Sequence, residues 1–198
     1  MQNLTVNEAR VMDFLVRNFK ERNSINQIAR RLKLSPMGAY KILKKLEKAN
    51  VVKAEEIGNA IYYKADLDEE IGRKLAEFVL VQNEFSNTYA KVYADDLKKL
   101  KDVALSCILY GSILKVGKEA KDVDALIIIE KKNYKKVSIK LADIQQIATK
   151  RIHDIRVTKE DLAKNLKKGN EAMIDMLKYG QVLWGAGIIV EAIKNGAS

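Results

Sequence analysis

Residues 28–46 read IARRLKLSPMGAYKILKKL, and this stretch decides the fold of the first third of the chain. Ser35 followed by Pro36 is typical of a helix start, because serine can accept a hydrogen bond from a free backbone amide and proline has no amide to leave unpaired. The predicted helix runs to about Asn50, and a shorter helix capped by Ser24 precedes it. The inward-facing positions of the later helix are apolar: Ala39, Ile42, Leu43 and Leu46.

Elements on both sides extend this pair of helices. Residues 6–18 space their apolar side chains with a helical period, which predicts another helix upstream. Downstream, Val51–Glu55 and Ala60–Lys64 are β-type runs around Glu56–Asn59, a turn sequence with glycine and asparagine. Three helices followed by a β-hairpin resemble a winged helix-turn-helix domain, and the resemblance covers about residues 5–66.

This resemblance implies a domain that binds double-stranded DNA. In such domains the third helix enters the major groove, so Met37, Tyr40 and Lys41 are expected at base edges. Basic side chains would bind phosphates without sequence preference: Lys44, Lys45, Arg30, Arg31 and Lys53. Residues 1–66 hold 13 of the 36 basic residues and 7 of the 26 acidic ones, hence +6 of the net charge of +10. The alternative is a winged helix that docks on a protein and whose basic face is merely solvated.

Residues 67–101 carry apolar and aromatic side chains at close to the 3.6-residue period of a straight α-helix, which predicts one long connecting helix. The positions are Ile71, Leu75, Phe78, Phe85, Tyr89, Tyr93, Leu97 and Leu100. Such a stripe could pack on either neighbouring domain or on a second copy of the chain, as in winged-helix proteins that bind two half-sites as homodimers.

A second pattern lies further along the chain. The apolar run Val103–Tyr110 predicts a buried strand and ends at Gly111 and Ser112, a turn whose backbone amides can bind phosphate. Nine residues later, Asp122 and Asp124 head another apolar strand, where side chains two apart point to the same side. Two such carboxylates suit magnesium. The sequence contains no Walker-type loop and no Gly-x-Gly-x-x-Gly pattern.

This arrangement, LYGS followed by nine residues and DVDALII, resembles the DNA polymerase beta-like nucleotidyltransferases, and more closely their small "minimal" members. The resemblance implies that Gly111 and Ser112 bind the triphosphate while Asp122 and Asp124 bind magnesium. It also implies a third catalytic and metal-binding carboxylate on a later strand. Asp154 is the candidate, and a structural ion pair with Arg156 is the alternative. His153, the only histidine, is predicted to be half-buried and to have no catalytic role.

The implied reaction transfers a nucleoside monophosphate, commonly AMP, from a nucleoside triphosphate such as ATP to an unknown acceptor. Two departures from the family pattern favour instead a transcriptional regulator that senses nucleotide without turnover. Lys121 stands where members often have serine, and Gly117 lies one position later than in many members. A third hypothesis is an antitoxin-type adenylyltransferase that modifies a protein acceptor.

Together these patterns predict an α+β protein with a winged helix over residues 1–66, a connecting helix over 67–101 and a small mixed-sheet, nucleotidyltransferase-like domain over 102–198. The single Cys107 excludes an intramolecular disulfide and lies in an apolar run, where a buried thiol is expected. No secretion signal opens the sequence, and the longest apolar patch, Val182–Val190, is shorter than the roughly 20 residues of a membrane span. A cytoplasmic protein is therefore expected.

Overall fold

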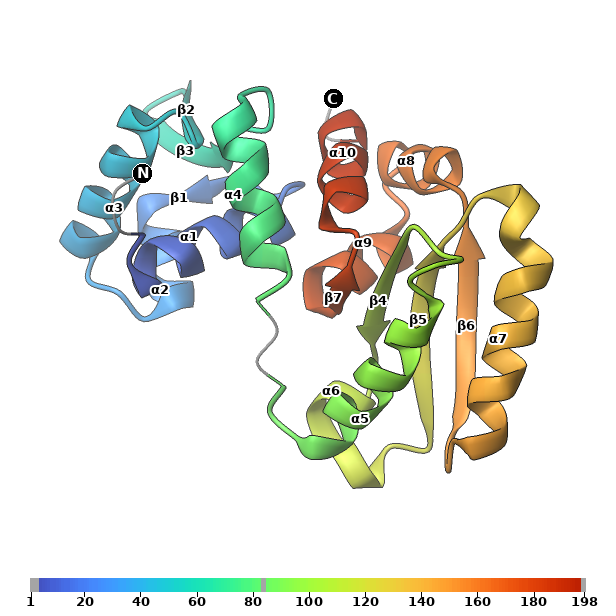
Figure 1. Ribbon diagram of the computed structural model, residues 1–198. Helices are drawn as coiled ribbons and strands as arrows, with labels where there is room; N and C mark the ends of the chain where they lie inside the picture. The colour runs from blue at the N-terminus through green and yellow to red at the C-terminus, as the bar shows by residue number, and fades with distance from the viewer. Residues whose placement is uncertain (1–3, 83–84, 197–198) are drawn as a thin grey trace. The chain divides into compact units, whose positions relative to one another are not determined.

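The computed structural model describes residues 4–82 and 85–196 of the chain (Figure 1). The chain divides into two compact units, Met1–Leu80 and Val81–Gly196. Each unit has a sheet and a hydrophobic core of its own, so the two are described separately. The mixed α+β architecture predicted from the sequence is confirmed, with a winged helix-turn-helix at the N-terminus and a mixed sheet at the C-terminus.

The N-terminal unit packs four helices with a small antiparallel sheet. Its elements are α1 (Val6–Arg17), β1 (Asn23–Ser24), α2 (Ile25–Leu32), α3 (Pro36–Lys48), β2 (Val52–Ile57), β3 (Ala60–Ala65) and α4 (Glu70–Leu80), and the strand order is β1-β3-β2. The predicted caps Ser24 and Ser35 are confirmed, since their side chains accept from the amides of Gln27 and Gly38. Thr5 caps α1 in the same way by accepting from the Glu8 amide. Fully buried side chains of the three helices, including Met12, Ile28 and Leu43, form the core.

The prediction of a single connecting helix over residues 67–101 is wrong. The structure has two helices there, α4 (Glu70–Leu80) in the first unit and α5 (Thr88–Leu97) in the second. The helical path ends at Leu80, and it starts anew after Asn87. The backbone of Asn87 is extended, with φ −145° and ψ 150°, and its side chain accepts from the Ala90 amide at 2.8 Å to cap α5. The apolar stripe is likewise divided, since Leu75 is buried in the first unit and Tyr93 in the second.

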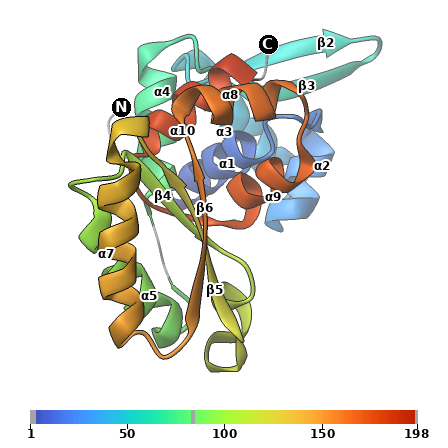
Figure 2. The same cartoon turned by 90° about the vertical axis from the view of Figure 1, so that its right-hand side faces the viewer.

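The C-terminal unit is a four-stranded mixed sheet with helices on both faces. Strands β4 (Ser106–Tyr110), β5 (Asp122–Ile128), β6 (Arg151–Val157) and β7 (Gln181–Trp184) follow the order β6-β5-β4-β7 (Figure 1). Figure 2 shows β4, β5 and β6 with α7 alongside them. β4 is antiparallel to both its neighbours, whereas β5 and β6 are parallel and joined through α7 (Tyr134–Ile147). The remaining helices are α6 (Ile113–Val116), α8 (Lys159–Lys167), α9 (Glu171–Tyr179), α10 (Ala186–Gly196) and the 3₁₀ turns Lys98–Leu100, Gly117–Glu119 and Lys131–Asn133.

The two faces of this sheet bury different side chains. Cys107, Val123 and Ala125 belong to the core cluster that also contains Tyr93 of α5 and Val137 of α7. On the opposite face, the buried strand β4 is contacted by α9 and α10. The predicted burial of Cys107 is confirmed, and burial raises the pKa of its thiol far above the usual range. Within the described part of the chain, no helix is both long and apolar enough to cross a membrane.

Candidate functional site

The outer face of α3 carries large apolar side chains that the core does not use. Met37 is 62% exposed and Tyr40 is 43% exposed, although both are side chains that a folded protein usually buries at least in part. Lys41 is exposed beside them. Within residues 4–82, no hydrogen bond or salt bridge engages its ammonium group. Methionine, tyrosine and a free cation together form a surface that can contact base edges and phosphates.

The other two lysines predicted on α3 already have acidic partners. Lys44 lies 2.7 Å from Glu47 on the same helix. Lys45 donates to the carboxylate of Glu8 at 2.6 Å, and Glu8 is buried, with its second carboxylate oxygen accepting from the Thr5 amide in the cap of α1. Lys45 therefore fastens α3 to the start of α1. This contact with Glu8 competes with the DNA phosphate contact that the sequence predicts for Lys45.

The wing is less basic than its sequence suggested. Lys53 of β2 lies 2.7 Å from Asp68 and 3.4 Å from Asp66, and Lys64 of β3 lies 3.1 Å from Glu55. The pKa of Lys53 is raised chiefly by its hydrogen bond to Asp68. Since each of these lysines faces a carboxylate, the wing contributes little net attraction for a polyanion.

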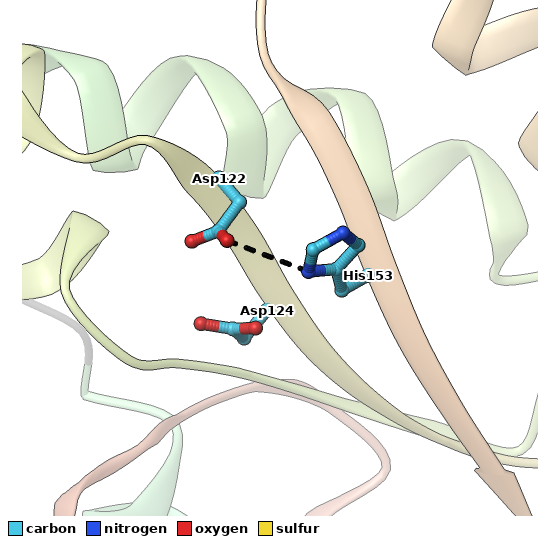
Figure 3. Close-up of side chains that lie close together, drawn as sticks. All are labelled: Asp122, Asp124 and His153. Atoms are coloured by element: carbon cyan, nitrogen blue, oxygen red, sulfur yellow. Dashed lines mark ion pairs between the residues drawn. The ribbon is translucent and has the colours of Figure 1, made fainter.

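A second candidate site lies on one face of the C-terminal sheet. Tyr110 of β4 pairs with Asp124 of β5, and Asp124 pairs with His153 of β6, so the three side chains form a row across neighbouring strands. Asp122 lies two residues before Asp124 on the same face. One ligand atom each from Asp122, Asp124 and His153 lie within 4.8 Å of one another (Figure 3). In this cluster His153 Nδ1 is 3.5 Å from Asp122 Oδ2.

The loop predicted to bind phosphate touches this cluster. Gly111 has φ +85°, a conformation that favours glycine, and a Cβ atom at this residue would lie 2.2 Å from Asp124 Oδ2. Burial, and then the neighbouring charge of Asp122, raise the pKa of the Asp124 carboxyl. Burial and Asp124 likewise raise the pKa of Tyr110. Ser112 is exposed at the start of α6, which has only four residues.

Asp154 does not join Asp122 and Asp124, so its predicted role as third metal ligand is wrong in position. It pairs in register with Ala125, whose side chain lies on the opposite face of the sheet. There the Arg156 guanidinium donates to Asp154, donates to Ser138 Oγ and stacks over the Tyr134 ring at 4.8 Å. Asp154 therefore forms the structural ion pair with Arg156 that is the alternative prediction.

His153 is the residue that the sequence reasoning left out of the site. It was expected to be half-buried and without a role, but it is exposed and lies on the face of the two aspartates. Adjacent residues of a strand point to opposite faces, so only one of His153 and Asp154 could join Asp122. The alternation of side chains along β6 could have identified His153 from the sequence, but only if the register of β6 against β5 were known.

The N-terminal unit is a winged helix-turn-helix domain of the DNA-binding class. Residues 14–53 match the family described as winged helix-turn-helix DNA-binding, a span that includes α2, α3 and the start of the wing. A solved structure of a mutant of Lactococcus lactis ZitR is 21% identical over 51% of this chain and 75% of that chain, with a TM-score of 0.30. No curated protein is significantly similar to the chain.

Proposed function

We propose that the chain is a DNA-binding transcriptional regulator that inserts α3 into the major groove of double-stranded DNA. The observation that carries this proposal is the exposed face of α3, where Met37, Tyr40 and Lys41 stand together in a domain of the matching family. Met37 and Tyr40 are assigned to base edges because apolar contacts and a phenolic hydroxyl can both discriminate bases there. Lys41 lies beside them and binds either a base or a phosphate.

The phosphate contacts are assigned to cations that the fold leaves available. Arg30 and Arg31 lie in the last turn of α2 and are exposed. Among the described residues neither arginine has a hydrogen bond or salt bridge to a carboxylate. Lys44 can exchange its surface contact with Glu47 for a phosphate at small cost, because exposed ion pairs of this kind contribute little to stability. Lys45 is assigned a supporting role through Glu8.

The C-terminal unit is proposed to be the effector domain, binding a divalent cation together with the phosphates of a nucleotide. Asp122 and Asp124 share one face beside Gly111, which supports such a site. Magnesium is the cation that the resemblance implies. The two aspartates fit it, but the three-carboxylate set does not, because Asp154 points to the other face. We also propose that the chain binds symmetric DNA sites as a homodimer.

Nucleotidyl transfer is the second candidate function. The close contact between Asp124 and Gly111 favours it, since the predicted phosphate turn and the predicted cation ligands are adjacent. The donor would be ATP with magnesium, and the acceptor a protein or another hydroxyl-bearing molecule. It ranks second because, among the described residues, no third carboxylate joins the cluster of Asp122 and Asp124.

One pair of measurements tests these functions. Fluorescence anisotropy with duplex DNA at low and rising salt should show binding that weakens strongly in Lys41→Glu/Lys44→Glu. Lys135→Glu/Lys136→Glu, the same charge change on exposed positions of α7, is the matched control. Equal weakening in both double variants would reduce the effect to net charge and sink the assignment to α3.

For the C-terminal unit, the chain is incubated with radiolabelled ATP and divalent metal. Binding without pyrophosphate release, abolished in Asp122→Asn/Asp124→Asn, supports the effector domain. Label transfer or pyrophosphate release that is lost in the same variant would promote the second candidate. Asp154→Asn is the control, because it removes a carboxylate from the other face of the sheet.

A further inference from the structure

We propose that Asp122, Asp124 and His153 form a mixed carboxylate–imidazole site for a divalent transition metal, such as Zn²⁺ or Co²⁺, in preference to Mg²⁺. The proposal rests on the effector site described above and adds the nitrogen ligand and the class of metal. Its geometric basis is the mutual distance of at most 4.8 Å between one ligand atom of each residue (Figure 3).

The site holds these ligands on rigid elements. All three residues belong to the parallel pair β5–β6, and Asp124 and His153 are direct partners in its register. The backbone of β5 is bonded on its other side to β4, so the strand that supplies both carboxylates is internal to the sheet. Ligands on paired strands keep their spacing without a metal, which lowers the ordering cost of binding.

The two carboxylates also lack the neutralising partners that acidic side chains find elsewhere in this protein. The chain has 36 lysines and arginines, and acidic residues such as Glu47, Asp68, Asp95 and Asp96 each form a salt bridge with a lysine. Within the described ranges, no lysine or arginine forms a salt bridge with Asp122 or Asp124, and His153 is their only basic partner. Lys150, which precedes His153 closely in the sequence, donates instead to the carbonyl oxygens of Lys118 and Ala120. Two adjacent carboxylates left in this state favour a bound cation.

The ligand set decides which cation. Magnesium requires oxygen ligands in near-ideal octahedral geometry, whereas imidazole suits zinc, copper, iron and nickel. Three protein ligands with an exposed histidine leave at least one coordination position open to water or to a phosphate oxygen. Cys107 cannot compete for such a metal, because it is fully buried on the opposite face.

The decisive experiment uses the full chain without a polyhistidine tag, stripped of metal with a chelator and titrated with Co²⁺. One Co²⁺ per chain should bind, with visible absorption bands, and NMR should detect the paramagnetically shifted signals of a single imidazole. His153 is the only histidine in the sequence, so these signals have one possible source. Competition should rank Zn²⁺ at or above Co²⁺ and place Mg²⁺ about 100-fold or more below it.

Variants locate the site. His153→Gln should weaken Co²⁺ binding by about tenfold or more and remove the imidazole signals, while changing Mg²⁺ affinity little. Asp154→Asn, at the adjacent residue on the other face, should bind Co²⁺ like the wild type. Circular dichroism establishes that each variant is folded. Unchanged Co²⁺ affinity in His153→Gln, or Mg²⁺ affinity equal to that for Co²⁺, would overturn the proposal.

Parallel titrations separate this proposal from the proposed function. If Mg²⁺ and ATP bind through the aspartates and His153→Gln has no effect, the metal class is wrong and the effector domain stands. If no divalent cation binds at any concentration tested, both the metal site and the effector domain fail. DNA binding measured on the metal-free chain reports on the winged helix alone.

Discussion

Gly111 lies directly against the carboxylate of Asp124, so closely that a Cβ atom on the glycine would be 2.2 Å from Oδ2. Gly111→Ala must therefore displace Asp124, and we expect it to weaken Co²⁺ binding about tenfold or more, as loss of a ligand's correct placement does. The measurement is the Co²⁺ titration described above.

Gly169→Ala is the control for that substitution. Gly169 has φ +70°, close to the +85° of Gly111, but a Cβ there meets nothing within 4 Å. Both alanine variants carry the backbone cost of positive φ, roughly 1 kcal/mol of stability, but only Gly111→Ala disturbs the site. Equal metal affinity in the two variants would show that Asp124 is not a ligand.

Lys41 and Lys45 are expected to separate DNA binding from stability. Lys45→Met leaves the buried carboxylate of Glu8 without its cation, so the free energy of unfolding of the N-terminal unit should fall by about 1–3 kcal/mol. Lys41→Met should change that free energy by no more than about 0.5 kcal/mol, because Lys41 is exposed and its ammonium group has no hydrogen bond or salt bridge among the described residues. Hydrogen exchange of α1 and α3 amides in the full chain measures both.

The same two variants should rank in the opposite order on DNA. Lys41→Met removes a contact in the groove. The slope of log K for DNA binding against log salt should therefore become shallower by about one. Lys45→Met should bind DNA with nearly wild-type affinity under conditions in which the variant is folded. A Lys45→Met variant of full stability that fails to bind DNA would return Lys45 to the phosphate contacts.

Glu8 should make the N-terminal unit sensitive to acid. Burial alone would raise the pKa of its carboxyl, but hydrogen bonds from Lys45 and Thr5 outweigh this and lower the pKa below its ordinary value of 4.5. A carboxyl whose pKa is lower when folded stabilises the protein above the unfolded pKa, and this stability is lost as the pH falls through the folded pKa. Stability of the unit should thus decline below about pH 4.5.

Glu8→Gln tests this dependence. The variant should be less stable than wild type at pH 7, and the gap should narrow as the pH is lowered towards about 3, since the wild-type carboxylate becomes neutral. Urea unfolding followed by exchange of α1 amides at several pH values gives the comparison. A difference in stability that stayed constant across this pH range would mean that the charge of Glu8 contributes nothing to the free energy of unfolding.

Asn87 should be the residue that starts α5 and joins it to α6. Its side chain accepts from the Ala90 amide at 2.8 Å and donates to the Ile113 carbonyl at 3.1 Å. Asn87→Ala should therefore cost about 1–2 kcal/mol in the C-terminal unit. The fluorescence of Trp184, the only tryptophan, reports unfolding of that unit.

The neighbouring Ser86→Ala provides the comparison for Asn87. Ser86 makes one exposed hydrogen bond, to the Leu114 carbonyl, so its removal should cost at most about 1 kcal/mol. If Asn87→Ala proved no more damaging than Ser86→Ala, the stability of α5 would not depend on its Asn87 cap.

The N-terminal fold was predictable because its signals are local. Ser24 and Ser35 cap helices within three residues of themselves, and the apolar positions of α3 follow from its own period. The connecting helix was mispredicted from the same kind of signal. A period carried from Ile71 to Leu100 cannot reveal that the apolar side chains serve two separate cores.

The sequence by itself determined which side chains of one element share a face: Asp122 and Asp124 two apart on a strand, and Met37, Tyr40 and Lys41 on one face of α3. Only the tertiary structure decided what meets across elements. The parallel register of β6 against β5 placed His153, and not Asp154, beside the aspartates. Packing of α3 against α1 joined Lys45 to Glu8, 37 residues away. Periodicity within a strand or helix is local chemistry, whereas register and packing depend on the whole core.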